Sequence, residues 1–400
     1  MLRKIFDLHY KMLEKYPSLR PFKPLIDAGD NFFYGTPHTT KEKPYIREGV
    51  DIKRFMIMVL FAVLPAAIAS VYFYGQRAIL VILASYIIGG LTEVIFCIVR
   101  KEEITEGFLI TGILYPLILP PTIPLWMLSV GIIFGVIFGK EVFGGTGKNP
   151  FNAALVARCF LYISFPLYMT GGAFVEPYPN SIAIENNKPV FQGLGGFTSH
   201  RGLFSHEIKN GKFDAMCEAT PLAKMKELRL KVAEQGSTPE DYQKYMNYVK
   251  TSLPNLFWGY RSGSMGETCA VLLILGGIML IAMKVANWRT ILSTILGGAV
   301  CSFFFYDANC LSDKLYLMAF TLLSGGFLFG AIFMTTDPVT GPITQTGRYF
   351  YGFAIGCIAL LIRRFSGYAE GIMFSILLMN IFAALIDEIV IMVRYRGVKK

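Results

Sequence analysis

The sequence predicts an all-α membrane protein that crosses the bilayer about ten times. Of its 400 residues, 54% are hydrophobic and 16% are charged, whereas a soluble domain carries roughly a quarter charged residues. Apolar runs of about spanning length recur along the chain, in two groups of five around one long polar stretch. The runs cover residues 55–74, 78–99, 108–122, 125–140 and 151–169, then 267–284, 289–306, 315–335, 349–364 and 371–393.

This pattern divides the chain into five segments. Residues 1–54 are basic, and residues 2–16 place apolar side chains on one helical face and basic ones on the other. That spacing predicts an amphipathic helix at the membrane surface. The remaining segments are a first transmembrane half, an external polar loop, a second transmembrane half and a tail, at residues 55–169, 170–265, 266–393 and 394–400.

Prolines interrupt the third apolar run, at positions Pro116, Pro120, Pro121 and Pro124. Proline removes a backbone donor and breaks a helix interior. The run therefore predicts a short, re-entrant or broken helix. A bilayer tolerates such backbone only where it lines a cavity or is buried in protein.

The charges at the chain ends predict its orientation. Eleven Lys and Arg residues lie within residues 1–54, and four more close the chain. By the positive-inside rule both termini are cytoplasmic, the number of spans is even, and the 170–265 loop is periplasmic. Arg363 and Arg364 oppose this assignment, because the span count places them outside. Since the basic residues gather beside membrane spans, the net charge of +10 does not indicate a nucleic-acid partner.

A weak internal repeat links the two halves. Residues 131–138 and 326–333 match at five of eight positions with a constant offset of 195. Transporter folds often contain repeated halves with sites at their interface. The span count makes these two helices parallel, so this repeat alone does not support inverted halves. Coincidence between Gly and Phe residues is an equal alternative.

Metal chemistry within this chain is not expected. No two of the seven cysteines are spaced C-x-x-C, and the four histidines lie in termini or loops without an H-x-x-x-H pair. Isolated cysteines in membrane helices usually behave as small apolar side chains. The sequence leaves open an iron–sulfur cluster shared with a partner subunit.

The long polar loop contains the motif D-A-M-C-E-A-T at residues 214–220, followed by Pro221. In a chain made mostly of apolar spans, a short polar motif in the one large loop is a candidate functional site. Proline favours an extended conformation at the preceding Thr220. An external polar loop would leave this threonine exposed to a modifying enzyme. The alternative is an ordinary loop threonine beside a proline.

A glycine-rich loop at residues 140–152 is the second candidate. Gly144, Gly145 and Gly147 allow the backbone to approach a ligand closely. Asn149 and Asn152 offer amide donors and acceptors suited to the carbonyl groups of a quinone or an isoalloxazine ring. The alternative is a glycine-rich turn between two helices.

Ionisable residues within or beside the apolar runs form the third group of candidates. Such groups are expensive at membrane depth and usually face a cavity, a partner or an ion path. Sodium prefers oxygen ligands, as calcium does. Helix capping is the alternative for Glu106 and Glu370, and a turn is the alternative for Asp337. Arg158 pairs with an acid, contacts a polar cofactor tail or extends to the interface. The acids are Glu93, Glu106, Glu141, Asp337, Glu370, Asp387 and Glu388.

Several strings of this chain match one known family. From about Pro21 to about Ile391, the sequence resembles the B-subunit family of bacterial sodium-translocating NADH:quinone reductases. The D subunits of Rnf complexes share parts of the same strings. They usually lack the basic N-terminal segment. The matching strings are F-Y at 33–34, V-D-I-K-R-F-M-I-M at 50–58, E-G-F at 106–108, L-P-P-T-I-P-L-W at 119–126, K-E-V-F-G-G-T-G at 140–147, N at 149, N-A-A at 152–154, T-D-P-V at 336–339, E-G at 370–371 and I-D at 386–387.

The resemblance implies a covalently bound flavin. In that family, the threonine ending the signature D-x-x-[ST]-G-A-T carries FMN through a phosphoester bond made by a flavin transferase. By position, Asp214, Ala219 and Thr220 match the acid, the alanine and the acceptor. Cys217 replaces Ser or Thr and Glu218 replaces Gly, and glutamate resists backbone conformations that glycine adopts. These two residues differ from the signature that the flavin transferase recognises.

The resemblance also implies two five-helix halves related by inversion, a non-covalent riboflavin, and a ubiquinone site near Gly144 and Gly145. The N-terminal residues Asp27, Phe33 and Tyr34 are implied to contribute to the quinone site. Family acids linked with sodium uptake and transfer match Asp27, Glu141, Asp337 and Asp387. The polar residues Asn149, Asn152 and Arg158 remain the candidates for cofactor contacts within the membrane domain.

The implied function is a membrane subunit of a sodium-pumping NADH:ubiquinone oxidoreductase in the bacterial inner membrane. Electrons would pass from FMN through riboflavin to ubiquinone, coupled to Na⁺ export. No G-x-G-x-x-G motif is present, so a different subunit would oxidise NADH. Five partner subunits are implied, including one with NADH, FAD and 2Fe–2S sites and another with covalent FMN. Two alternatives remain: an Rnf-type electron-transport subunit, and a flavin-free channel or transporter on a similar scaffold.

Overall fold

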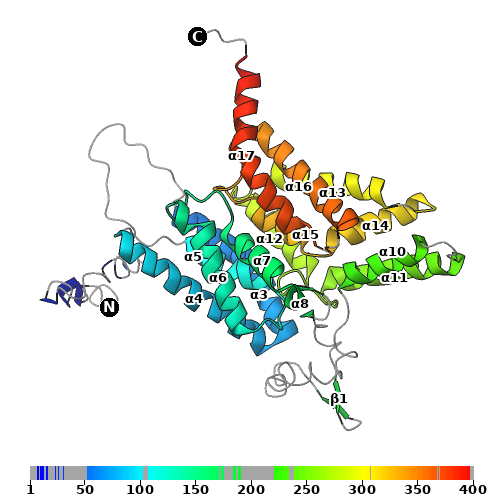
Figure 1. Ribbon diagram of the computed structural model, residues 1–400, viewed down its shortest axis with the longest axis horizontal. Helices are drawn as coiled ribbons and strands as arrows, with labels where there is room; N and C mark the ends of the chain where they lie inside the picture. The colour runs from blue at the N-terminus through cyan, green and yellow to red at the C-terminus, as the bar shows by residue number, and fades with distance from the viewer. Residues whose placement is uncertain are drawn as a thin grey trace.

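The protein is described by a computed structural model, in which the chain forms a bundle of helices (Figure 1). The structure describes residues 52–101, 107–170, 173–174, 183–185, 188–190, 220–233, 238–306, 308–366, 368 and 370–396, with isolated positions before residue 31.

Each predicted apolar run contains a helix. The first half comprises α3 (Ile52–Tyr74), α4 (Gln76–Arg100), α5 (Gly107–Leu117), α6 (Leu125–Gly139), η2 (Glu141–Phe143), α7 (Ala153–Ser164) and α8 (Pro166–Met169). The second half comprises α12 (Ala270–Ala282), α13 (Trp288–Phe305), α14 (Leu311–Leu323), α15 (Phe327–Phe329), the π-helix η6 (Gly330–Met334), α16 (Gln345–Phe365) and α17 (Ile372–Arg394).

The prediction of a multi-pass membrane protein is confirmed, and the count of ten spans stays a prediction. Five of the described helices are long and apolar enough to cross a bilayer, and a sixth span exists if α14 and α15–η6 form one span bent by 63°. The apolar helices α5, α7 and α12 have fewer than 18 residues, whereas a full span needs about 20. α16 is long enough but carries arginines at both ends.

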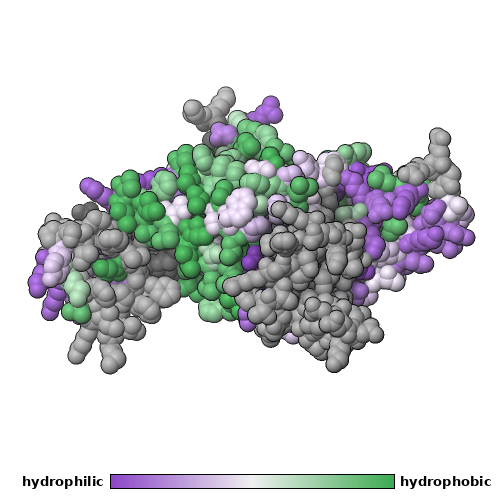
Figure 2. Space-filling model, turned by 60° about the horizontal axis from the view of Figure 1, so that its bottom comes forward, coloured by the Kyte–Doolittle hydropathy of each residue, from purple (hydrophilic) through white to green (hydrophobic). Residues whose placement is uncertain are grey.

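The surface agrees with a membrane setting. Apolar side chains gather over the middle of the face shown in Figure 2, with hydrophilic side chains toward both ends. On α4, every fourth residue from Ile79 to Val99 is an exposed apolar one. Residues four apart are neighbours on a helix surface, so the six side chains form one continuous apolar stripe that winds along α4. Contiguous apolar surface of this kind needs lipid or a partner protein to cover it.

The proline-rich interruption after α5 is buried against the start of the second half. α5 ends at Leu117, and the chain is not helical again until α6. The carbonyl oxygens of Leu117 and Leu119 accept hydrogen bonds from the backbone N–H groups of Gly266 and Met265, at 2.6 and 3.1 Å. The freed backbone groups are therefore satisfied inside the protein, as the sequence requires of a broken helix at membrane depth.

A second interruption separates α14 from α15, and Arg363 of α16 stabilises it. The guanidinium of Arg363 donates to the carbonyl oxygens of Thr321, Ser324 and Gly325, at 2.6, 3.1 and 2.9 Å. These are orphan acceptors at a helix C-terminus. Because Arg363 is buried and engaged in this way, it is not a loop charge. These contacts therefore explain why Arg363 does not follow the positive-inside rule.

The segment between the halves contains regular structure. α10 (Pro221–Ala233) and α11 (Pro239–Trp258) form a helical hairpin that packs on α14 (Figure 1). Asp313 of α14 accepts from Lys250 at 2.9 Å and from the Tyr242 hydroxyl at 3.0 Å. The strands β1 (Ala183–Glu185) and β2 (Lys188–Val190) pair antiparallel. Among the described residues, β1 and β2 are the strands in an otherwise helical fold.

The two segments of the internal repeat end at the same place in the fold. Residues 131–138 lie in α6, and residues 326–333 extend into η6. Lys140 follows α6, Thr336 follows η6, and both residues line the same cavity, described below. The relation between the two halves stays a prediction.

Candidate functional site

A partly open cavity lies between the two halves of the bundle, with about 750 Å³ of empty space including its mouth. It is called the first cavity below. Apolar residues from the start of α3 and the end of α12 form much of its wall. Its polar lining includes Lys140, Thr146, Asn149, Asn152, Thr336 and Asp337. The structure thus brings the glycine-rich loop and the T-D-P-V segment together at one place.

The glycine-rich loop has a backbone conformation that glycine permits. Gly144, Gly145 and Gly147 have φ values of 108°, 88° and 91°, which side-chain-bearing residues rarely adopt. Space beside Gly145 and Gly147 is open, since an added Cβ would meet nothing within 4 Å. These glycines shape the loop, and Thr146 between them faces the cavity.

The two asparagines both hold the loop in place. Asn149 donates to the carbonyl oxygen of Phe151 at 2.9 Å. The Asn152 side-chain oxygen caps α7 by accepting from the N–H groups of Ala154 and Leu155, at 3.1 and 3.4 Å. Asn152 also donates to Asp337 Oδ2 at 3.3 Å. Its amide therefore connects the first half to the second at the cavity wall.

Among the described acids that the sequence linked with sodium, Asp337 alone lines the first cavity. It also accepts from the N–H of Val339 at 3.1 Å, which is the side-chain turn that the Asp-Pro sequence favours. Asp337 therefore lines the cavity and also stabilises a turn, so these two interpretations of the residue are compatible.

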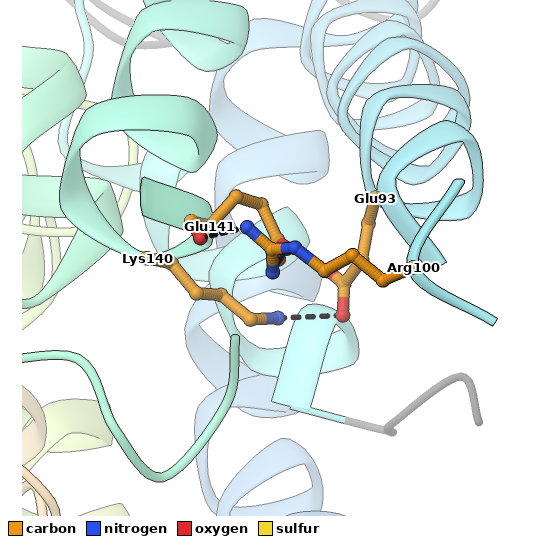
Figure 3. A network of polar contacts seen from close by, with 4 residues as sticks. All are labelled: Glu93, Arg100, Lys140 and Glu141. Atoms are coloured by element: carbon orange, nitrogen blue, oxygen red, sulfur yellow. Dashed lines mark hydrogen bonds and ion pairs between the residues drawn. The ribbon is translucent and has the colours of Figure 1, made fainter. Parts of the chain in front are cut away.

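Glu141 is buried in an ion-paired network beside the first cavity (Figure 3). Arg100 of α4 contacts Glu141 Oε2 at 2.9 Å, and Lys140 contacts Glu93 of α4 at 2.5 Å. The two neighbouring residues after α6 are thus fastened to α4 by opposite charges. Buried pairs of this kind hold their partners strongly, because losing one partner leaves an uncompensated charge.

Asp387 has a different setting on α17. It accepts from the N–H groups of Ile343 and Thr344, at 2.7 and 2.9 Å, and from the Thr344 hydroxyl at 2.5 Å. Thr344 is the residue that caps α16. The structure therefore separates Glu141, Asp337 and Asp387 into three environments. Asp27, Phe33, Tyr34, Glu106, Asp214, Cys217, Glu218 and Ala219 lie outside the described residues.

A second cavity, of about 370 Å³, lies toward the other end of the bundle. Thr268 lines it just before α12, whereas Leu280 near the end of α12 lines the first cavity. The helical rise separates these positions by about 18 Å. The polar residues of the second cavity include Thr220, Arg261, Ser262, Glu267, Ser324 and Glu370.

Thr220 lies at the start of α10, in the cap position of this helix. Its hydroxyl oxygen accepts from the N–H of Ala223 at 3.3 Å, and Pro221 occupies the first helical position, which suits proline. The expectation of an exposed threonine is wrong, because Thr220 is only 8% exposed. Packing of the α10–α11 hairpin on the bundle buries it, and a local motif does not reveal such packing.

Two polar atoms of the second cavity lack partners within the described part of the chain. They are the hydroxyl oxygen of Ser262 and the Oε2 atom of Glu267. Buried polar groups in proteins are nearly always hydrogen-bonded. Arg261 lies beside them, donates to Ser252 Oγ at 3.1 Å and stacks over Tyr248. The cavity therefore offers both a donor and an acceptor to a polar ligand.

Arg158 pairs with Glu370, which confirms the first of its three alternatives. Arg158 lies on α7 and is 2% exposed, while Glu370 precedes α17 and is 7% exposed. The capping role considered for Glu370 is not observed, because Gly371 occupies the cap position of α17. Of this pair, Glu370 is the residue that lines a cavity, and Arg158 positions it.

The sequence analysis missed Arg261, Ser262 and Glu267. They belong to the string R-S-G-S-M-G-E-T at residues 261–268. Its small polar residues and two glycines directly precede an apolar run, which is a signal for a shaped loop at a helix entrance. The long polar stretch around it obscured this signal.

Comparison with known proteins decides the family. Residues 39–396 match the family described as NQR2, RnfD, RnfE. The chain belongs to this family. It is 32% identical to the B subunit of the Na(+)-translocating NADH-quinone reductase of Chlamydia pneumoniae, with full coverage of both chains. It is 31% identical to the corresponding B subunits of Chlamydia felis and Pseudomonas paraeruginosa, covering 97% and 98% of this chain and 98% and 96% of theirs. This family member thus matches its relatives over nearly their whole length.

Proposed function

We propose that this family member is the flavin-carrying membrane subunit of a sodium-pumping NADH:ubiquinone oxidoreductase. Its relatives are named as the B subunit of such an enzyme, which implies a multi-subunit complex. On this proposal both termini are cytoplasmic, the 170–265 segment is periplasmic, and the membrane is the bacterial inner membrane. Five other subunits take part, including one that oxidises NADH with FAD and a 2Fe–2S cluster and one that carries a second covalent FMN.

The observation that carries the proposal is the position of Thr220. The threonine that matches the family's flavin acceptor lines a cavity and caps a helix of 13 residues. Backbone N–H groups and the helix dipole favour a phosphate at such a terminus. Arg261 in the same cavity supplies a positive charge. The residues present therefore fit a flavin attached to Thr220 through its phosphate.

The unpartnered atoms of Ser262 and Glu267, which lack partners among the described residues, support this fit, because a flavin ring has both hydrogen-bond donors and acceptors. FMN supplies the electron-carrying chemistry, and the protein supplies its attachment, orientation and electrostatic surroundings. Thr220 would hold the cofactor, Arg261 would neutralise its phosphate, and the buried walls would exclude water.

The first cavity suits the ubiquinone end of the pathway. It combines apolar walls with amide, hydroxyl and charged groups from both halves, which is the usual composition of a small-molecule site. Asp337 in this cavity supplies oxygen atoms of the kind that Na⁺ prefers. A non-covalent riboflavin in this subunit would connect the two ends.

In-gel flavin fluorescence of the denatured chain tests the proposal, with wild type beside Thr220→Val. Thr268→Val is a matched control, because Thr268 is also a buried threonine of the second cavity. We expect fluorescent bands for wild type and Thr268→Val and a dark band for Thr220→Val. A dark wild-type band would contradict covalent flavin and favour a flavin-free transporter.

A further inference from the structure

The carboxylate of Glu267 is fixed in the second cavity with one oxygen free. Its Oε1 atom accepts from the backbone N–H of Ser264 at 2.9 Å. Its Oε2 atom is buried without a hydrogen-bond partner within the described residues. One oxygen therefore anchors the group, and the other is a buried acceptor without a partner among the described residues.

Glycines from two segments make room for this carboxylate. A Cβ added to Gly263 would lie 2.5 Å from Oε1, and one added to Gly326 would lie 2.9 Å from Oε2. Gly326 also has a positive φ of 65°, which favours glycine. The loop before α12 and the interruption between α14 and α15 are thus both shaped around Glu267.

Glu267 also differs from the other charged groups nearby. Glu370 is paired with Arg158, and Arg363 donates to three carbonyl oxygens. Within the part of the chain that the structure describes, Glu267 forms no ion pair. Ser262, only 3% exposed, adds a hydroxyl group that also lacks a partner among these residues.

We propose that Glu267 and Ser262 hold the imide edge of the flavin attached at Thr220. That edge presents one N–H flanked by two carbonyl oxygens. Glu267 accepts from the N–H, and the Ser262 hydroxyl donates to a carbonyl oxygen. This assignment rests on the proposed function, and it names the residues that orient the ring rather than the residue that attaches it.

The assignment has an electrostatic consequence. Reduction of a flavin adds electrons to the ring, and a fixed carboxylate beside the ring opposes added negative charge. Burial raises the pKa of Glu267 to about 7, so the carboxylate prevails at pH 8, where it lowers the midpoint potential of this flavin. Replacing it with glutamine keeps the size and a hydrogen-bonding group but removes the charge, so Glu267→Gln raises the potential.

The test uses the assembled complex carrying wild type, Glu267→Gln or Ser262→Ala in this subunit. Glu227→Gln is the control, because Glu227 lies on α10 with 60% of its side chain exposed. In-gel fluorescence first verifies covalent flavin in each variant. A visible redox titration, with the Thr220→Val complex subtracted, then gives the midpoint potential of this flavin. Redox-difference infrared spectra report the hydrogen bonding of its carbonyl groups.

Supporting results are a more positive potential in Glu267→Gln, a shifted carbonyl band in Ser262→Ala and no change in Glu227→Gln. Unchanged potential and carbonyl bands in fluorescent variants would overturn the assignment while leaving the proposed function intact. A dark wild-type band would instead overturn the proposed function. If Glu267→Gln fails to assemble, the carbonyl bands of Ser262→Ala decide, and unchanged bands overturn the assignment.

Discussion

Arg158 on α7 and Glu370 before α17 form a buried ion pair that joins the two halves of the bundle. The two residues are 212 positions apart in the sequence. The pair also places Glu370 in the wall of the second cavity. The same two side chains therefore hold the two halves together and shape the proposed flavin site.

Breaking this pair is expected to destabilise the fold strongly. Glu370→Gln leaves the Arg158 charge buried and unpaired, which costs about 3–5 kcal/mol. Replacing both residues with methionine removes both charges and is expected to recover most of that loss. Thermal unfolding of the purified protein in detergent measures both effects. Lys231→Met is the control, because it breaks an exposed pair with Glu227. Equal destabilisation by the double and single variants would contradict the expectation.

Asp337 and Asp387 are expected to respond differently to neutral substitution. Asp337→Asn removes a charge from the first cavity, so the Na⁺ concentration for half-maximal turnover should rise roughly tenfold, or about 1.4 kcal/mol. Asp387→Asn weakens the contacts that hold the start of α16 and should lower thermal stability instead. Sodium titrations of turnover, with unfolding curves beside them, separate these effects. Unchanged sodium dependence in Asp337→Asn would remove Asp337 from the sodium path.

Asn152 is expected to have two separable roles. Serine can still cap α7 but cannot reach Asp337 with an amide donor, whereas alanine loses both contacts. Loss of a helix cap costs about 1 kcal/mol. Asn152→Ala should therefore be less stable than Asn152→Ser by about that amount, and both should alter quinone reduction similarly. Unfolding midpoints and quinone-reduction kinetics measured on both variants test this. The capping role would be excluded if the two variants were equally stable.

Burial of Thr220 has a consequence for maturation. A transferase cannot reach the hydroxyl of a threonine residue that is only 8% exposed, so we expect flavin attachment before the α10–α11 hairpin docks. Lys226 donates to the carbonyl oxygen of Ser366 at 2.6 Å, and Arg229 lies over Tyr306. Lys226→Ala with Arg229→Ala should loosen this docking. The doubly substituted, flavin-free protein should then accept FMN from the transferase several-fold faster than the parent.

The control for this experiment is Lys231→Ala, an exposed substitution on the same helix. It should leave the rate of flavin incorporation, followed by in-gel fluorescence, unchanged. Equal rates in all three proteins would mean that α10 does not restrict access to Thr220.

The sequence predicts what depends on local pattern. Apolar runs locate the helices, the prolines locate the end of α5, and the glycines of residues 144–147 mark a loop with backbone freedom, where positive φ angles are observed. Each of these features follows from the periodicity or backbone freedom of neighbouring residues.

The sequence does not predict what depends on packing between distant segments. Arg158 alone could pair with any acid, and its partner Glu370 is revealed by the fold. Thr220 is polar and is the last residue of a polar motif, yet docking of α10 buries it. Glu267 and Ser262 lie in a cavity whose shape depends on Gly326, about 60 residues further along the chain, because a side chain there would collide with Glu267. These relationships carry no local signal.

The segment from Ser324 to Asp337 borders both cavities. Ser324 and Gly325 line the second cavity, and Phe333, Thr336 and Asp337 line the first. Between them lies the π-helix η6, whose backbone bonds span one residue more than those of an α-helix. A residue inserted or deleted here would shift one end of the segment against the other. This stretch should therefore keep a constant length among functional relatives, whereas the polar segment before Thr220 is free to vary.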